Sequence, residues 1–459
     1  MFAQHNSASK RGELMDVMTS ISFVYVVLPL AMAVYLICPA RRRTAALLVF
    51  SLLFYFVAAP VVLLWMLGVA VTDLVILALM KLHDDHPPAR KVCLAFSLVK
   101  NISCILLLGG TLQGGRAAPE VLLGLYVVTL SAMGYVLDVY RGKVNHTGSP
   151  VNFALYCFYF PRLAAGPLLP YSEFAPALKS PNTSPLQIAK GLGMFIQGAV
   201  KFGVLGQVLL IFYQTLREVP QGDASVLGMW VMVFVLILSV YYRFSGCADM
   251  AVGIGRMMGF SLPRNFNFPY LSKSVTGFFQ RFNLSLTHYV NDALGPRFTN
   301  GENVKETALG LLVIGAAGGI WFGVAIGRVA WGIYLGLFLI MERYLYPGPL
   351  KKMPPAACRI YALLIIFLSF ALFDAASLAA GAQTVGRMLG IGGLPFFSAH
   401  LGYLLVANRL LLIGGALFAT GVFGRLLSFM REHFPACAYG ALMTVINLLL
   451  LALFTAFSV

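Results

Sequence analysis

The sequence predicts an all-α polytopic membrane protein. Of its 459 residues, 59% are hydrophobic and only 11% are charged, and the mean hydropathy is +0.83. Soluble domains carry about 25% charged residues. Apolar runs that approach the ~20 residues needed to cross a bilayer recur from one end of the chain to the other. Because lipid offers the backbone no hydrogen-bond partners, we expect these runs to be helices.

The charge balance predicts a lipid bilayer, and no nucleic acid, as the partner of the chain. Lys and Arg number 33 against 17 Asp and Glu, which gives a net charge of +16. The basic residues lie in short loops between apolar segments, as in the positive-inside pattern, and do not form one basic surface. Alternate loops over the first 143 residues hold eight basic residues on one side and one on the other. The eight are Arg41, Arg42, Arg43, Lys81, Arg90, Lys91, Arg141 and Lys143, and the one is Arg116.

This asymmetry places the side of Arg41 in the cytoplasm and the N-terminus outside, in a multi-pass protein of the cell membrane. The first expected span, Val17–Cys38, follows a polar segment with no A-x-A-like cleavage site, so we expect it to be retained. The apolar stretch Thr44–Met80 contains Ala58-Ala59-Pro60, which predicts two helices with a tight turn between them.

Two polar residues, Lys100 and Asn101, lie in the middle of the expected span Cys93–Leu108. The lysine either snorkels or pairs with a neighbouring helix, or else it contacts a substrate. The segment Val139–Leu178 is rich in Pro, Gly and aromatic residues and cannot form a plain span. Further helices are expected at Leu186–Arg217, Val226–Tyr242, Ala356–Phe373, Ala375–Leu389, Leu401–Phe423 and Ala436–Phe457.

The stretch from Tyr241 to Leu345 has the highest density of polar groups between apolar helices. Polar groups at membrane depth cost several kcal/mol unless they are paired, so their presence indicates a functional role. They are Asp249, Arg256, Arg281, Asn283, His288, Asp292, Trp321, Trp331, Glu342 and Arg343.

Two parts of this stretch, YYRFSGCADMAVGIGRMMGFSLPRNFNFPYLSKSVTGFFQRFNLSLTHYVNDALG and GGIWFGVAIGRVAWGIYLGLFLIMERYL, resemble the membrane-bound O-acyltransferase family. The resemblance is strongest to its bacterial branch, the membrane subunits of alginate and polysaccharide O-acetyltransferases. The family segments D-V-Y-R-G and F-P-x-L-x-A-G-P are matched at Asp138–Gly142 and Phe160–Pro167.

The resemblance covers residues 19–390. It implies an N-terminal polar extension at 1–18, a family core at 19–390 and C-terminal transmembrane helices at 391–459. The expected fold is a bundle of about 11 transmembrane helices with re-entrant and horizontal helices around a central cavity. The implied reaction moves an acyl group from acetyl-CoA or another acyl thioester to a hydroxyl of an envelope polysaccharide, with no bound cofactor.

The family's catalytic positions are altered in this chain. A W-H-G triplet in the family becomes Trp321-Phe322-Gly323, and the histidine of Y/F-H-G becomes Leu335. An earlier W-H or W-N pair is matched by Phe282-Asn283, and the Asn283 amide could hydrogen-bond a carbonyl or hydroxyl, or else join two helices. A phenyl ring cannot carry a proton, and loss of a general base costs about 10²–10⁴-fold in rate. The small-residue packing pattern is kept at Gly319, Gly323, Gly327, Gly332 and Gly336.

Other polar residues are candidates for the proton acceptor that the two histidine positions lack. His288 lies about 500° around a helix from Asn283, so the two share no face, and a structural or interfacial role is expected for it. Asp249 is expected to pair with Arg243 or Arg256. The alternative is a water-mediated base, either Asp292 or Asp249. Arg281 and Trp321 are further cavity candidates. No histidine has metal-ligand spacing, so no metal site is predicted.

Three hypotheses remain. The first is a degenerate member that keeps the fold as a scaffold for an acyl donor, a lipid or an envelope protein that modifies polysaccharides. The second is an active O-acyltransferase with a displaced catalytic group. The third is a transport role built on the same cavity, although the chain lacks the paired broken helices typical of transporters.

Overall fold

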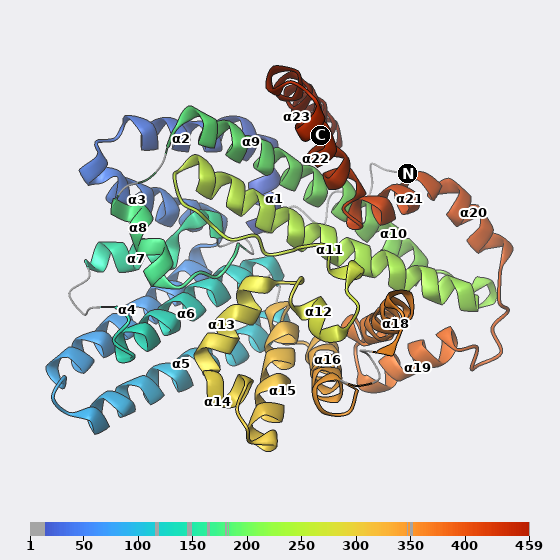
Figure 1. The fold of residues 1–459 in the computed structure, drawn as a ribbon, viewed down its shortest axis with the longest axis horizontal. Helices are drawn as coiled ribbons and strands as arrows, with labels where there is room; N and C mark the ends of the chain where they lie inside the picture. Colours follow the sequence, from blue (N-terminus) through green and yellow to red (C-terminus); the bar gives the residue numbers. More distant parts are fainter. Residues whose placement is uncertain are drawn as a thin grey trace. The chain divides into compact units, whose positions relative to one another are not determined.

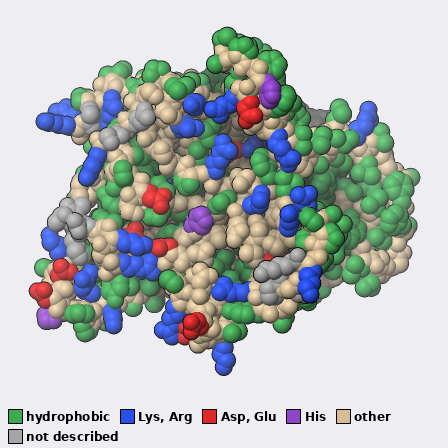
Figure 2. Space-filling view, viewed as in Figure 1, with side chains coloured by type: hydrophobic (Ala, Val, Ile, Leu, Met, Phe, Trp, Pro, Cys, Tyr) green, Lys and Arg blue, Asp and Glu red, His purple; other side chains and the backbone are tan. Residues whose placement is uncertain are grey.

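Helices form nearly all the regular structure in the computed structural model (Figure 1), which describes residues 14–114, 119–144, 149–162, 166–179, 181, 183–346, 348 and 352–458. The all-α prediction is confirmed. Seven helices of the described residues are long and apolar enough to span a membrane, or eight if one bent pair forms a single span. The expected number of about 11 spans stays a prediction. Figure 2 shows hydrophobic side chains over broad areas of the surface, as a lipid-facing protein requires.

The described chain forms two compact units. The first holds residues 1–192 with Ala251–Leu262 and Ser458, and the second holds Gly193–Met250, Pro263–Phe457 and Val459. The first unit contains α1 Leu14–Thr19, the π-helical turn η1 Phe23–Val27, α2 Leu28–Ile37, α3 Ala40–Ala58, α4 Pro60–Leu82, α5 Pro87–Gly114, α6 Pro119–Tyr140, α7 Pro150–Phe158, the 3₁₀ turn η2 Phe160–Arg162 and α8 Tyr171–Lys179.

Three helices contribute residues to both units, α9 Pro185–Val200, α11 Val226–Met257 and, by its last residue alone, α23 Ala436–Ser458. The second unit contains the remaining elements: η3 Lys201–Gly206, α10 Gln207–Arg217, η4 Gln221–Asp223, η5 Pro269–Leu271, α12 Val275–Phe279, α13 Leu284–Leu294, α14 Pro296–Thr299, α15 Val304–Trp321, α16 Ile326–Tyr344, α18 Pro355–Phe373, α19 Leu378–Met388, α20 Ala399–Ala407, α21 Arg409–Ala419 and α22 Val422–His433.

The residues predicted to interrupt helices do so in the structure. Ala59 has an extended, non-helical backbone between α3 and α4, and Pro60 starts the second helix at a position where a missing N–H costs nothing. The Pro-rich segment 139–178 contains the short elements α7, η2 and α8 in place of one span. Both predictions are confirmed. The predicted polar extension at 1–18 lies almost wholly outside the described residues.

Two predicted spans have different bounds in the structure. The helix predicted at Val226–Tyr242 continues to Met257. The span predicted at Leu401–Phe423 is wrong as a single helix, because α20 and α21 meet at an angle of 64° and α22 is separate. The bend lies at Asn408, which ends α20 with a non-helical backbone and whose side-chain Nδ2 and backbone N–H both donate to the carbonyl of Leu404, at 2.9 and 3.1 Å.

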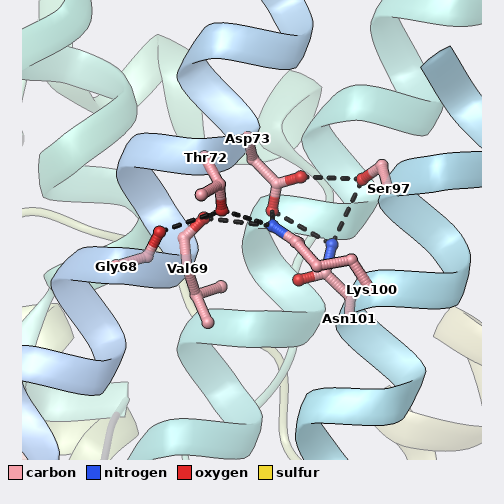
Figure 3. Close-up of polar contacts among 7 residues, drawn as sticks. All are labelled: Gly68, Val69, Thr72, Asp73, Ser97, Lys100 and Asn101. Atoms are coloured by element: carbon pink, nitrogen blue, oxygen red, sulfur yellow. Dashed lines mark hydrogen bonds and ion pairs between the residues drawn. The ribbon is translucent and has the colours of Figure 1, made fainter.

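In the first unit, Lys100 and Asp73 form an ion pair that joins α5 to α4 (Figure 3). Lys100 Nζ lies 2.8 Å from Asp73 Oδ2 and also donates to Thr72 Oγ1 at 2.8 Å. Ser97 Oγ and Asn101 Nδ2 donate to the two oxygens of the same carboxylate, at 2.8 and 3.0 Å. The expected pairing of Lys100 with a neighbouring helix is confirmed, and its partner is a fully buried aspartate.

Glycines bring α15 and α16 into close contact in the second unit. A Cβ atom on Gly315 would collide with the carbonyl oxygen of Gly332, and one on Gly319 would collide with that of Arg328. Only residues without a side chain allow the two backbones to approach so closely. The hairpin therefore fixes the turn at Phe322, which follows the last residue of α15.

Candidate functional site

Asn283 occupies the position just before α13 and has a left-handed backbone, with φ of 53°. Asparagine tolerates this conformation better than most residues with a side chain. Its side chain is buried, and neither Oδ1 nor Nδ2 has a hydrogen-bond partner among the described residues. An unpaired buried polar group costs about 1–3 kcal/mol. An amide kept at this cost is a candidate for binding something else.

The Asn283 side chain lines a cavity of about 10 Å³, which is room for about one water molecule. Phe322 lines the same cavity, so the structure brings together two of the sequence-predicted site residues. The complete lining is Phe279, Phe282, Asn283, Leu286, Thr287, Val290, Ile314, Gly318, Phe322 and Trp331.

The ring of Phe322 is buried among four other aromatic rings. Its centroid lies 4.5 Å from that of Phe244, 5.3 Å from Phe373, 5.9 Å from Trp331 and 6.0 Å from Phe282. Three of these pairs meet edge to face, an arrangement that contributes about 0.5–1.5 kcal/mol per pair beyond the buried area. Phe322, which the motif resemblance aligns with the family's histidine, is therefore part of an aromatic core.

Trp331 is a cavity residue that the sequence analysis did not select as a site residue. It is buried on α16, and its Nε1–H has no acceptor within the described part of the chain. Leu335 lies one helical turn further along and is fully buried, but it is not among the lining residues. Trp321 is buried and also lies outside the lining. The one signal in the sequence was the place of Trp331 among the polar groups of the Tyr241–Leu345 stretch.

Glu342 is a second residue whose part in the site the sequence did not reveal. Its carboxylate accepts hydrogen bonds from the backbone N–H groups of Val275 and Thr276, at 2.6 and 2.8 Å, and from the Thr276 hydroxyl at 2.7 Å. These donors lie at the start of α12, where a negative charge is favoured. Because α12 supplies Phe279 and leads into Asn283, we regard Glu342 as a positioning residue.

The other predicted site residues lie away from this cavity. His288 is exposed on α13, and Arg281 is half-buried, with its carbonyl accepting from the backbone N–H of Asn267 at 2.9 Å. Asp249 forms an ion pair of 2.5 Å with Lys201, a partner that the sequence analysis did not name. None of these three residues belongs to the cavity lining.

The cavity offers hydrogen bonds and no proton carrier. Among its described lining residues, polar groups come only from the Asn283 amide, the Thr287 hydroxyl and the Trp331 indole. An amide can donate to a carbonyl and accept from a hydroxyl, and an indole N–H can donate. None of these groups takes up a proton near neutral pH, so the lining can orient a ligand but cannot act as a general base.

Comparison with known proteins agrees with the motifs and the fold. The model of the membrane-bound O-acyltransferase family matches residues 120–380, more than half of the chain. A probable alginate O-acetylase from Pseudomonas fluorescens is 26% identical over 389 residues, which cover 82% of this chain and 76% of the relative.

Two further relatives act on other polymers, as their names state. A peptidoglycan O-acetyltransferase from Helicobacter pylori is 29% identical over 253 residues, or 53% of this chain and 47% of the relative. A teichoic acid D-alanyltransferase from Bacillus subtilis is 23% identical over 225 residues, or 46% of this chain and 56% of the relative. Together with the helical fold and the W-F-G and F-N motifs, the match over residues 120–380 shows that this multi-pass membrane protein belongs to the membrane-bound O-acyltransferase family.

Proposed function

We propose that this chain is a membrane subunit of a system that O-acylates an envelope polysaccharide, and that it serves there as a scaffold without transferring acyl groups by the family's histidine mechanism. The observation that carries the proposal is the packing of Phe322. Its ring, at the position that the motif resemblance aligns with the family's catalytic histidine, packs between Phe244, Phe373 and Trp331 and lines a cavity with room for about one water.

The chemistry of acyl transfer supports this proposal. The acceptor hydroxyl must lose a proton as it attacks the thioester carbonyl, and the developing oxyanion needs a donor. Asn283 Nδ2 and Trp331 Nε1 could supply donors, since both are buried and unpartnered in the described structure. The proton acceptor is the missing component, because the residues found at the two histidine positions are Phe322 and Leu335.

A second candidate, an active acyltransferase with a displaced base, is favoured by one specific observation. Both polar atoms of the buried Asn283 amide are without partners in the described residues and line the cavity. A purely structural asparagine would be expected to use them. Under this alternative the amide binds the acyl carbonyl or the acceptor hydroxyl, acetyl-CoA is the donor, and a group outside the cavity lining takes the proton.

The test is an acetyl-transfer assay with the full-length protein in lipid nanodiscs, radiolabelled acetyl-CoA and a polysaccharide acceptor. We expect no transfer above the protein-free background. The same assay is run with Asn283→Ala. If the unaltered protein turns over and Asn283→Ala stops turnover, the scaffold proposal is wrong and the second candidate is correct.

We also propose that the N-terminus lies outside the cell, on the basis of the eight basic residues on the side of Arg41 against one on the other. Alkaline phosphatase is active only after export, so a fusion to the N-terminus and one to the loop at Lys81 distinguish the two orientations. We expect activity only from the N-terminal fusion. Activity only from the loop fusion would reverse the topology.

A further inference from the structure

The second unit contains a larger groove that is separate from the Asn283 cavity. It encloses about 490 Å³, within the usual range of small-molecule sites. One wall comes from the segment around η5, and the other from α22 and the turn that precedes it. The lining residues are Arg264, Phe268, Leu271, Thr420, Gly421, Gly424, Arg425, Ser428, Phe429 and Glu432.

Helix α22 is amphipathic and turns its polar face to this groove. Arg425, Ser428, Phe429 and Glu432 recur at helical spacing and line the groove, whereas the face at Phe423, Leu426, Leu427 and Met430 is apolar and does not. None of the residues of α22 is buried. A short helix with one apolar and one polar, charged face is typical of the membrane–water interface.

Two arginines line the groove, one from each wall. Arg264 and Arg425 are exposed and come from opposite walls. Neither guanidinium has an ion-pair or hydrogen-bond partner in the part of the chain that the structure describes. Glu432 is the one acidic residue of the lining, so the charged lining groups sum to a net positive charge. Two unpaired guanidiniums on facing walls suit an anion with several acceptor oxygens, above all a phosphate group.

Two lining residues of the groove, Phe268 and Gly421, are in close contact. Phe268 has a left-handed backbone with φ of 45°, which is costly for an aromatic residue. Its ring lies so close to Gly421 that a Cβ atom there would collide with it. The backbone of Gly421 is also left-handed, with φ of 71°. Any side chain at 421 would displace the ring. Together with Leu271 and Phe429, this ring provides an apolar surface beside the arginines.

We propose that this groove binds an anionic membrane phospholipid, with its phosphate between Arg264 and Arg425 and the upper part of its acyl chains against Phe268, Leu271 and Phe429. The juxtaposition of unpaired cations, aromatic surface and an interfacial helix favours a lipid over a soluble phosphate. Glu432 accepts a hydrogen bond from a hydroxylated headgroup. The site is independent of the proposed function, because it shares no lining residue with the Asn283 cavity.

The experiment measures lipid binding to the purified full-length protein in detergent by native mass spectrometry, with phosphatidylglycerol and phosphatidylcholine as probes. We expect phosphatidylglycerol to bind more tightly than phosphatidylcholine. The double variant Arg264→Gln/Arg425→Gln should weaken phosphatidylglycerol binding at least about tenfold, since each arginine near an anionic lipid contributes roughly a factor of five. The Arg264→Lys/Arg425→Lys variant should retain most of the binding, which separates loss of charge from misfolding.

Arg431→Gln is the matched control, because Arg431 is exposed on the same helix but lies outside the groove lining. Equal binding by the double Gln variant and this control would overturn the proposal. Equal binding of the two lipids would also overturn it. Inorganic phosphate is tested as a competitor. If millimolar phosphate displaces phosphatidylglycerol completely, the site serves a soluble anion and the assignment to a lipid is wrong.

Discussion

The side chain of Asn283 and the ring of Phe322 line the same cavity of about 10 Å³, although one residue lies just before α13 and the other just after α15. The amide is unpartnered within the described structure, and the ring is held by aromatic neighbours. A site that keeps a hydrogen-bonding group beside an aromatic core is suited to holding a ligand. It is poorly suited to removing a proton.

The packing of Phe322 predicts how its variants rank in stability. Phe322→Ala should destabilise the protein by about 3–5 kcal/mol, because it leaves a cavity among four rings. Phe322→His should cost less and leave the fold intact, since an imidazole preserves most ring contacts. Thermal unfolding in nanodiscs measures both variants. If Phe322→Ala unfolds at the same temperature as the unaltered protein, the ring does not occupy the core described above.

The unpaired amide of Asn283 predicts that its removal has little effect on stability. Asn283→Gly keeps the left-handed backbone and deletes the amide, so the free energy of unfolding should change by less than about 1 kcal/mol. Asn283→Val is the comparison, and it should be clearly worse because β-branched residues disfavour this backbone. A loss above about 2 kcal/mol for Asn283→Gly would mean that the amide has a structural partner.

The buried pair of Asp73 and Lys100 predicts non-additive mutations. Lys100→Met leaves a buried carboxylate without its counter-charge and should destabilise the protein by about 3–5 kcal/mol. Adding Asp73→Asn should restore part of this loss, because the neutral amide still bonds to Ser97 and needs no counter-charge. Lys81→Met, at the exposed end of α4, is the control and should change little. Additive single and double variants would contradict the pairing.

The hydrogen bonds of Glu342 predict a stability effect that reaches the cavity. Glu342→Ala removes three charge-assisted bonds to Val275 and Thr276, and it should cost at least about 2 kcal/mol. Glu342→Gln should cost less because an amide oxygen still accepts one of them. Glu302→Ala, an exposed loop change, is the control. Intrinsic tryptophan fluorescence should report the loosening near Trp331. An unchanged spectrum and melting temperature in Glu342→Ala would refute this role.

Local residue chemistry predicted much of the fold. Pro60 marked the break between α3 and α4, and apolar runs marked most of the long helices. The bend between α20 and α21 was missed because a hydropathy pattern does not register the single non-helical residue, Asn408, at which α20 ends. Mean hydropathy is high on both sides of that bend, so the sequence reads as one span.

The candidate site was predictable only in part. Motif resemblance selected Asn283 and Phe322, which the structure places on one cavity. The contributions of Trp331 and Glu342 depend on how α16 packs against α12 and α15, and no short-range pattern encodes that packing. The pairing of Asp249 with Lys201 was missed for the same reason, since the two residues come from different elements.

The most direct test of the central claim is the initial rate of acetyl transfer by this protein, measured beside the probable alginate O-acetylase of Pseudomonas fluorescens in identical nanodiscs with the same donor and acceptor. A missing general base predicts a rate about 10²–10⁴-fold below that of the relative, or no detectable transfer. Equal rates for the two proteins would contradict the claim and show that the reactive group lies elsewhere in this chain.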